Sequence, residues 1–417
     1  MEEKAGVKPP RPLLILSDAP SAQTGLGRIA ADLATGIHQH LGEIFRVATF
    51  GYGGAGARRF VFPQYAFASR QYAVAGVEDW VLPSLPQVWA DFAGNEKGII
   101  LTIWDASRLT WFSQPVHSDL LTGYPGLRDW LVQARFERWG YFPIDAAGPN
   151  GKLSFPLQQT LLGFDRILAY TQWAQGIVLK SVEGQRPQFD LDYLPHGIDT
   201  DVFFETNRPL CRRLFFRLTG AQTLTDTPIA VADDELLIGI VATNQARKDW
   251  ALGIETAALL AKDRKVRLWV HTDILERAWS IPALLIDHGL LGNAAISLGY
   301  LPDDQMAEAY SACDVTLGIG LGEGWGYPLA ESLACGTPVI HGNYGGGAEF
   351  VPDWMKVEPI AYRSEGLYAC VRPVFRAHDW AERVLQVAGQ RVGLDPRYAW
   401  SNLWPRWEAW LRKGLKS

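Results

Sequence analysis

Two carboxylates in the second half of the chain are spaced to act on a single ligand. Glu323 and Glu331 lie eight positions apart, separated by a glycine-rich turn over residues 322–326 and then by Pro328. Proline suits the first position of a helix, so this pattern predicts a loop that carries Glu323 and a helix whose first turn carries Glu331. The free N–H groups at such a helix start bind anions. Carboxylates beside that anion would accept hydrogen bonds from hydroxyls, which is the chemistry of a nucleotide-sugar site.

The elements that position these carboxylates can be predicted from the surrounding residues. We expect a strand over 315–319, a helix that begins at Pro328 and stops at Gly336, and a second strand from Pro338. An alternative is a buried crossover in which the glutamates merely complement the helix dipole. The glycines around the first glutamate and the run ACGTPVI after the helix make the ligand-binding interpretation more specific.

This stretch resembles the retaining glycosyltransferases of the GT-B fold, especially the large family 4 group. Their hallmark is E-G-F-G-x-x-x-x-E-A-x-A-x-G-x-P-V, and this chain reads EGWGYPLAESLACGTPV from Glu323 onwards. Trp325 replaces the usual Phe, and Ser332 replaces the usual Ala. The resemblance implies a nucleoside diphosphate sugar as donor, a hydroxyl as acceptor and net retention at the anomeric carbon. It covers nearly the whole chain, but it is specific in the second half and loose in the first.

Two adjacent cations follow the first strand expected in the second half. Arg247 and Lys248 lie in the segment VATNQARKDW, at an expected helix start where cations oppose the helix dipole. A bound anion would explain their position, and the resemblance implies that this anion is pyrophosphate. Asn244 in the same segment is a further candidate donor of hydrogen bonds to the ligand. A solvated basic pair is the alternative.

The resemblance also implies roles for these residues. Glu323 would hold hydroxyls of the donor sugar, and Glu331 would hold the ribose. Lys248, Arg247 and the N–H groups around residues 324–326 would stabilise the departing diphosphate. The predicted donor-binding residues are Gly25, Gly27, Asn244, Arg247, Lys248, Glu323, Gly324, Trp325, Gly326 and Glu331. Because cations and a helix start already neutralise the diphosphate, we predict no metal ion and no cofactor.

The first half of the chain opens with a strand, a glycine loop and an amphipathic helix. Leu13 to Leu16 form the expected strand, and the loop contains Gly25 and Gly27. Short glycine loops of this kind also occur for packing reasons alone. The position resembles the N-terminal glycine loop of the family, which lies near the donor phosphates.

The N-terminal part of the reaction centre is less well defined. Many relatives have a His-Asp pair after the fourth strand, where this chain has Trp104 and Asp105. We predict Asp105 as a fourth catalytic residue beside Glu323, Lys248 and Arg247, because it is placed to bind a sugar hydroxyl or orient the acceptor. Acceptor specificity is expected in the loops over residues 51–59 and 104–124.

Length and alternating patterns predict the architecture. A chain of 417 residues is long enough for two domains, and alternating strands and helices indicate parallel sheets covered by helices. We expect an α/β fold of the GT-B type, with two Rossmann-like doubly wound domains facing a cleft. The N-terminal acceptor domain would span 1–200, and the donor domain 201–397. The C-terminal helix, 398–417, would cross back to the N-terminal domain, with its tryptophans as the docking face.

Composition limits the partners. Apolar and charged fractions of 48% and 20% fit a globular protein, and no apolar run reaches the roughly 20 residues of a membrane span. The N-terminus lacks the apolar core of a signal peptide, so we expect a cytoplasmic location. A net charge of −6 argues against nucleic acid as a partner, although modified DNA as the acceptor stays open.

Two other functional classes are also compatible with the sequence. One is a different enzyme on the same fold, a nucleotide-sugar epimerase or a phosphorylase, and product identification without added acceptor separates it from a transferase. The other is a catalytically degenerate partner subunit that binds a nucleotide sugar without chemistry. The missing histidine before Asp105 motivates this second class, and donor binding without turnover would support it.

Overall fold

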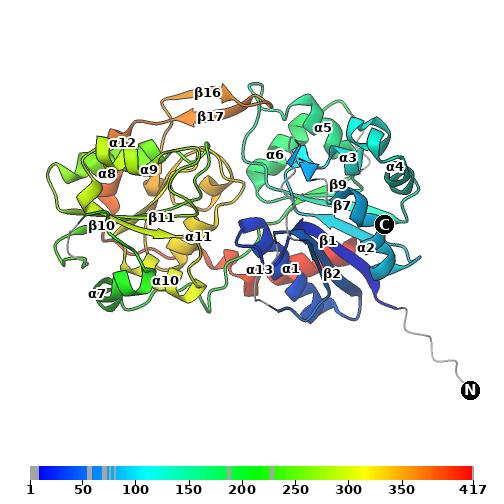
Figure 1. The fold of residues 1–417 in the computed structure, drawn as a ribbon, viewed down its shortest axis with the longest axis horizontal. Helices are drawn as coiled ribbons and strands as arrows, with labels where there is room; N and C mark the ends of the chain where they lie inside the picture. Colours follow the sequence, from blue (N-terminus) through cyan, green and yellow to red (C-terminus); the bar gives the residue numbers. More distant parts are fainter. Residues whose placement is uncertain are drawn as a thin grey trace, which may run out of the picture. The chain divides into compact units, whose positions relative to one another are not determined.

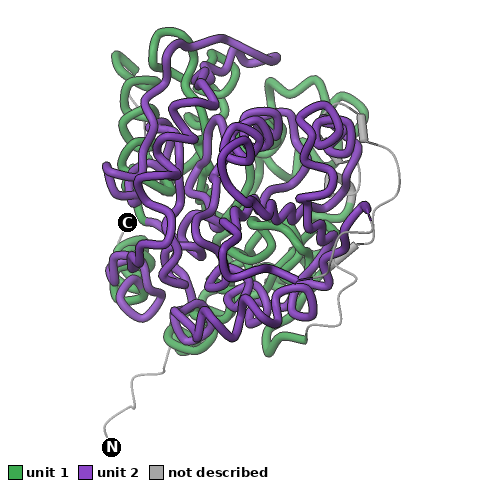
Figure 2. Tube along the Cα trace, turned by 90° about the vertical axis from the view of Figure 1, so that its left-hand side faces the viewer, with its two compact units in different colours: residues 1–194, 404–417 green, residues 195–403 purple. Residues whose placement is uncertain are grey.

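The chain folds as two compact units, which Figure 2 distinguishes by colour. Unit 1 comprises residues 1–194 and 404–417, and unit 2 comprises residues 195–403. The computed structural model describes residues 9–53, 59–67, 73–74, 77–78, 81–185, 189–225 and 230–415. Of the predicted acceptor loop 51–59, residues 54–58 therefore lie outside the described part.

Unit 1 is built on a seven-stranded sheet in the order β3-β2-β1-β6-β7-β8-β9, with every neighbouring pair parallel. The strands are β1 (Arg11–Asp18), β2 (Phe45–Tyr52), β3 (Gln64–Phe67), β6 (Gly98–Thr102), β7 (Phe136–Phe142), β8 (Arg166–Ala169) and β9 (Asp190–Tyr193). A separate antiparallel pair consists of β4 (Ala73–Val74) and β5 (Val77–Glu78). Leu13 to Leu16 are fully buried in β1, as expected for a strand covered on both faces by helices.

Helices cover this sheet (Figure 1). They are α1 (Gly25–Leu41), α2 (Val81–Ala93), α3 (Thr110–Ser113), α4 (Pro125–Val132), α5 (Phe155–Leu162) and α6 (Gln172–Ser181). In α1, Ile29, Leu33 and Ile37 recur at helical spacing and are buried. The amphipathic pattern of the sequence therefore predicts the face of α1 that packs on the sheet.

The last helix, α13 (Trp400–Lys413), belongs to unit 1 from residue 404 onwards. Its Trp407 ring contacts Tyr141 with ring centroids 5.0 Å apart. Its Trp410 and Trp139 of β7 pack edge to face, with ring centroids 5.1 Å apart, and the guanidinium of Arg166 lies 4.3 and 4.6 Å from the respective centroids. The predicted docking role of the tryptophan stripe is thus confirmed for these two rings.

Unit 2 contains a six-stranded sheet in the order β12-β11-β10-β13-β14-β15, again with parallel neighbours. Its strands are β10 (Leu236–Val241), β11 (Val266–Thr272), β12 (Ala294–Leu298), β13 (Val315–Gly318), β14 (Val339–Gly342) and β15 (Lys356–Val357). An antiparallel hairpin of β16 (Ala361–Glu365) and β17 (Cys370–Val374) forms its own two-stranded sheet.

Helices accompany the strands in the described part of unit 2. They are α7 (Arg208–Thr219), α8 (Trp250–Ala261), α9 (Ile281–Asp287), α10 (Asp303–Ala312), α11 (Tyr327–Ala334) and α12 (Ala377–Val387). The predicted order of strand, loop, helix and strand around Glu323 and Glu331 is confirmed by β13, α11 and β14. Among the described residues, no helix has both the length and the hydrophobicity needed to cross a bilayer.

Each sheet has one point at which the chain reverses its direction of travel across the strands. In unit 2, β10 lies between β11 and β13, and in unit 1, β1 lies between β2 and β6. In open parallel sheets, ligands bind outside the carboxyl ends of the strands at such a point. The loops that follow β10, β13, β1 and β6 are therefore the places to look for a site.

Candidate nucleotide-sugar site

Two loops lie side by side at the reversal point of unit 2. The amide of Asp249, in the loop after β10, donates to the carbonyl of Ile319 at 2.9 Å. The amide of Leu321, in the loop after β13, donates to the carbonyl of Arg247 at 2.9 Å. An isolated antiparallel bridge also joins Lys248 to Gly320. These backbone bonds fix the two loops against each other, and with them the side chains that they carry.

The fixed loops bring together three of the predicted residues. The carboxylate of Glu323 accepts hydrogen bonds from Lys248 Nζ at one oxygen and from Arg247 at the other, the latter at 3.2 Å. Arg247 also donates to the carbonyl of Gly322 at 3.0 Å. The exposed fractions of the side chains are 10% for Lys248, 12% for Glu323 and 30% for Arg247. Each residue was predicted for the site from the sequence, but this ion-paired arrangement was not.

The charges of this group favour an anionic ligand. Burial by itself raises the pKa of Glu323, but the charges of Lys248 and Arg247 outweigh burial and lower that pKa to about 2. Glu323 is therefore ionised at neutral pH. Two cations and one carboxylate leave one net positive charge, held at the amino-terminal side of α11. A helix start carries a further partial positive charge, so an anion placed here gains from both.

Glycines allow a third loop to close on Glu323. The amide of Gly346 donates to the carbonyl of Glu323 at 2.8 Å. A Cβ on Gly345, whose φ is +83°, would lie 3.1 Å from both the backbone nitrogen and the backbone oxygen of Glu323. Gly326, the N-cap of α11, has a φ of +102°, which residues with a side chain rarely adopt. Loops after three neighbouring strands, β10, β13 and β14, therefore meet at one residue, Glu323, whose backbone contacts the loop after β14 and whose carboxylate contacts the loop after β10.

Glu331 lies in α11 with most of its surface buried, at 6% exposure. One of its carboxylate oxygens accepts a hydrogen bond from the hydroxyl of Tyr310 on α10 at 2.9 Å. Burial, together with the charge of Glu331, raises the pKa of Tyr310 well above its usual value, so this hydroxyl stays a donor. The predicted binding of ribose by Glu331 stays a prediction.

Asn244 is fully engaged within unit 2. Its side-chain amide nitrogen lies within 3.2 Å of the carbonyls of Ile274, Leu275 and Trp279, and its oxygen accepts from the amide of Trp279 at 3.0 Å. This bonding ties the loop after β10 to the loop after β11. The structure thus gives Asn244 an anchoring role, whereas the sequence suggested a donor to the ligand.

Trp325, Gly324 and Gly326 complete the predicted part of the loop. Trp325 is only 2% exposed, and its ring packs against His196 and Phe350 with centroids 4.3 and 5.1 Å apart. The observed role of this side chain is therefore packing inside unit 2. Gly324 is buried and Gly326 is half-buried, so the turn between Glu323 and α11 is formed largely by backbone.

His341, at the end of β14, is a neighbour of this site that was not predicted from the sequence. It is completely buried, and its Nδ1 lies 2.7 Å from the carbonyl oxygen of Gly318. Since a carbonyl only accepts, Nδ1 carries the hydrogen and Nε2 has the lone pair. Within the described residues Nε2 has no hydrogen-bond partner. Burial lowers the pKa of His341, so the ring is neutral. The sequence signal that could have identified this residue is a histidine near the end of an expected buried strand.

In unit 1, the predicted residues Gly25, Gly27 and Asp105 lie on the loops that follow β1 and β6. Gly25 and Gly27 form the first turn of α1, and Asp105 is half-buried just before a 3-10 turn at Ala106–Arg108. A Cβ on Gly27 would lie 2.6 Å from the carbonyl oxygen of Ala19. At Gly27, therefore, tight packing alone accounts for glycine.

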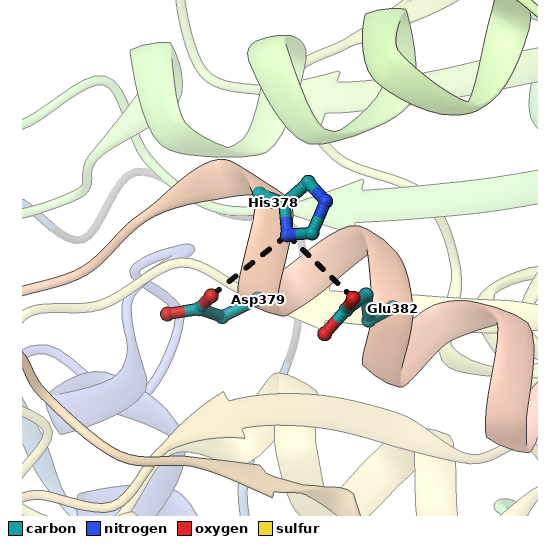
Figure 3. A group of neighbouring side chains, drawn as sticks. All are labelled: His378, Asp379 and Glu382. Carbon is teal, nitrogen blue, oxygen red and sulfur yellow. Dashed lines mark ion pairs between the residues drawn. The ribbon is translucent and has the colours of Figure 1, made fainter.

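One group of potential metal ligands occurs among the described residues, and none of its members was predicted for the site. His378, Asp379 and Glu382 lie on α12 (Figure 3). His378 Nδ1 is 3.7 Å from a carboxylate oxygen of Glu382 and 4.0 Å from one of Asp379. Asp379 is also paired with Arg376 at 3.1 Å. The group is adequately explained as surface ion pairs on one helix.

Comparison with known proteins places the site within a matched segment. Residues 226–358 match the family model described as glycosyl transferases group 1. The D-inositol 3-phosphate glycosyltransferase of Geodermatophilus obscurus is 29% identical over 258 residues, which are 60% of this chain and 52% of that protein. This chain therefore spans about half the length of that curated relative. The matched segment contains Arg247, Lys248, Glu323 and Glu331.

Solved structures resemble the chain over nearly its whole length. Anabaena Alr3699/HepE in complex with UDP and glucose superposes with a TM-score of 0.65 at 14% identity, covering 97% of this chain and all of that chain. Sucrose-phosphate synthase from Thermosynechococcus elongatus gives 0.63 at 14% identity, covering 97% of this chain and 99% of that one. Together with the two parallel sheets, these likenesses confirm the predicted GT-B fold.

Proposed function

We propose that this chain, whose residues 226–358 match the family model of glycosyl transferases group 1, transfers a sugar from a nucleoside diphosphate sugar to a hydroxyl. The observation that carries the proposal is the group formed by Lys248, Arg247 and Glu323 beside the start of α11. It offers cations for a diphosphate and a carboxylate for sugar hydroxyls. Similar structures were solved with UDP and UDP-glucose, which supports a nucleotide sugar as donor.

In the proposed reaction the cations act on the leaving group. The bond from the anomeric carbon to the diphosphate oxygen breaks, and negative charge grows on the diphosphate. Lys248 and Arg247 stabilise this charge, since preorganised donors act most strongly where charge develops in a buried site. The acceptor oxygen bonds to the anomeric carbon, and its proton passes to the departing phosphate oxygen. Attack on the face that the diphosphate leaves gives net retention, as in family 4.

Glu323 has a separate task in the proposal. Because its pKa is about 2, it is a carboxylate at neutral pH and accepts hydrogen bonds from donor-sugar hydroxyls. Its second effect is electrostatic, since a carboxylate near the anomeric carbon stabilises the positive charge that develops there as the bond to diphosphate lengthens. In unit 1, the turn at Gly25 and Gly27 stays the candidate for the donor, and Asp105 stays the candidate for the acceptor. The proposed transfer includes no metal ion, because Lys248, Arg247 and the start of α11 supply positive charge to the diphosphate.

The proposal is tested first by nucleotide binding. Wild type, Lys248→Ala and the control Lys265→Ala are titrated with UDP, GDP and ADP in a thermal-shift assay. Lys265 is a suitable control because it forms an exposed pair with Asp234. A nucleotide at 100 times its dissociation constant stabilises a protein by about 2.7 kcal/mol. We expect one nucleotide to stabilise wild type and Lys265→Ala but not Lys248→Ala, and no stabilisation by any nucleotide would contradict the proposal.

Turnover is then measured with the sugars of the preferred nucleotide. Inositol phosphates, hexose phosphates and water are offered as acceptors, with and without EDTA, and products are identified by mass spectrometry and NMR. We expect a glycoside with the anomeric configuration of the donor, at a rate that EDTA does not change. An epimerised donor, formed without acceptor, would favour an epimerase instead.

One observation favours a second candidate function, a nucleotide-sugar-binding subunit without chemistry. Trp104 lies where many family members have a histidine, and its indole N–H is bonded to Asp18 at 3.0 Å. This side chain therefore cannot supply the polar group that the histidine supplies in relatives. Nucleotide-sugar binding that depends on Lys248, together with no product for any acceptor or for water, would establish this second function.

A further inference from the structure

Asp18, the last residue of β1, joins two segments that follow neighbouring strands. It is only 8% exposed. One carboxylate oxygen accepts a hydrogen bond from the indole N–H of Trp104 at 3.0 Å, and the other accepts from the hydroxyl of Thr24 at 2.6 Å. Trp104 follows β6 and is itself 4% exposed. A buried carboxylate with a donor on each oxygen is held firmly, since hydrogen bonds to ionised groups are short and strong.

Thr24 connects Asp18 to the first turn of α1. Its hydroxyl oxygen accepts a hydrogen bond from the amide of Gly27 at 3.0 Å and so caps the helix. A hydroxyl has one hydrogen to donate, and Asp18 fixes where that hydrogen points. The lone pairs of Thr24 are thereby directed to Gly27, as an N-cap requires. Gly25 and Leu26 lie between the two bonded positions, so their backbone is set by the same chain of contacts.

The place of this network in the sheet gives it functional meaning. β1 and β6 are adjacent parallel strands, with Leu16 opposite Thr102, and β1 is the reversal point of the sheet. The network therefore ties together the two carboxyl ends at which ligands bind in folds of this kind. The glycines and Trp104 stand out in the sequence, whereas no pattern there gives Asp18 a role.

We propose that Asp18 is a positioning residue for glycosyl transfer, which holds the turn Thr24–Gly27 in its working conformation with Trp104 as the second anchor. This inference rests on the proposed function. Asp18 acts through Thr24 and Trp104, each of which bonds one of its carboxylate oxygens. In this protein the residue at the position of the histidine in many relatives, Trp104, thus helps to hold the glycine turn through its bond to Asp18.

The positioning itself is tested by hydrogen exchange, which needs no substrate. Amide exchange in residues 19–30 is measured by mass spectrometry for wild type, Asp18→Ala and Thr24→Val. We expect exchange at residues 24–28 to be about tenfold or more faster in both variants, because the turn opens more readily without its restraint. Unchanged exchange in Asp18→Ala would overturn the inference.

A conservative variant separates positioning from a general loss of packing. Thr24→Ser keeps the hydroxyl that donates to Asp18 and caps α1, so it should retain slow exchange. Asp91→Ala is the matched control, because it removes another carboxylate of unit 1 that is bonded to a hydroxyl, that of Tyr65 at 2.5 Å. Fast exchange in the control or in Thr24→Ser would show that the effect is not specific to this network.

The functional part is tested by comparing binding with turnover. Asp18→Ala should lower kcat for release of the nucleotide from its sugar, with water as acceptor, by about tenfold or more, as small misplacements do. Its dissociation constant for the free nucleotide should stay within about twofold of wild type. An unchanged kcat, despite faster exchange, would overturn the functional part. Absence of nucleotide binding in wild type would instead refute the proposed function, with the positioning still decided by exchange.

Discussion

Lys248 and Glu323 form an ion pair across two loops in which neither side chain is more than 12% exposed. The loops follow β10 and β13, which are adjacent in the sheet although the two residues are 75 positions apart in the sequence. A diphosphate that binds here must share Lys248 and Arg247 with this carboxylate. The pair therefore links donor binding to the stability of unit 2, and the first predictions separate the two effects.

Replacement of Lys248 by alanine should affect both binding and stability. We expect nucleotide affinity to fall by about tenfold or more, since hydrogen bonds to charged groups contribute about 1.5–3 kcal/mol. The free energy of unfolding should fall by about 2 kcal/mol, because Glu323 stays buried with Arg247 as its remaining cation. Calorimetric titration and urea unfolding measure the two changes.

A double variant distinguishes these effects. In Lys248→Ala with Glu323→Ala, no buried carboxylate is left without its partner, so most of the lost stability should return. Nucleotide affinity should stay low, because the cation is still missing. If affinity returned together with stability, Lys248 would act on folding alone and would have no direct role with the ligand.

Acid should weaken the protein through Glu323 in a defined range of pH. Its pKa in the folded state is about 2, against 4.5 for the free side chain. A carboxyl with a lowered folded pKa stabilises the folded state above its unfolded pKa, and this stabilisation is lost as the pH falls from 4.5 to about 2. The full loss is on the order of 3 kcal/mol. The free energies of unfolding of wild type and Glu323→Gln, measured with urea, should therefore approach each other as the pH falls below 4.5. A difference between the two free energies that does not change with pH would contradict the assigned pKa.

Local patterns in the sequence predicted the site loop and the fold well. The turn and helix around Glu323 are encoded by consecutive residues, glycines followed by Pro328, and the strands are encoded by buried aliphatic runs such as Leu13 to Leu16. The pairing of Lys248 with Glu323 was not predictable in this way. It depends on β10 lying beside β13, which is a property of strand order and not of any local pattern.

Side-chain surroundings were the part that sequence patterns could not supply. Trp325 occupies a motif position, yet the structure uses its ring for packing against His196 and Phe350. Asp18 and His341 belong to no recognised motif, and their roles depend on partners that follow other strands or lie on them, Trp104 at 86 positions from Asp18 and Gly318 at 23 positions from His341. Burial of a polar side chain depends on the whole tertiary structure, so these residues emerge only when the fold is known.

The glycine turn after β14 should be needed to keep the Glu323 loop in place. Gly345→Ala introduces a Cβ that lies 3.1 Å from the backbone of Glu323, at a φ of +83°. We expect an approximately tenfold loss of nucleotide affinity and a destabilisation of about 1–3 kcal/mol, because φ +83° with ψ −178° is a backbone conformation open essentially only to glycine. Gly366→Ala is the matched control, with a φ of +70° and open space around the new Cβ. Equal affinities for the two variants would show that crowding at Glu323 is unimportant.

His271, which was not predicted for the site, should make the free energy of unfolding depend on pH in a higher range than Glu323 does. His271 of β11 is 9% exposed, and its Nδ1 lies 2.9 Å from the hydroxyl of Ser297. Burial lowers its pKa from 6.5 to about 4, so the folded state favours the neutral ring. The free energy of unfolding is therefore highest above pH 6.5 and falls as the pH drops from 6.5 towards 4, because His271 in the unfolded chain takes up a proton that the buried ring does not. Each pH unit in this range should lower the free energy of unfolding by about 1.4 kcal/mol.

Urea unfolding at pH 7.5, 6 and 5 should show this slope in wild type and a shallower one in His271→Gln, which keeps a hydrogen bond to Ser297 without a titrating group. Equal slopes for the two proteins would assign the acid sensitivity to other groups, such as the buried His341.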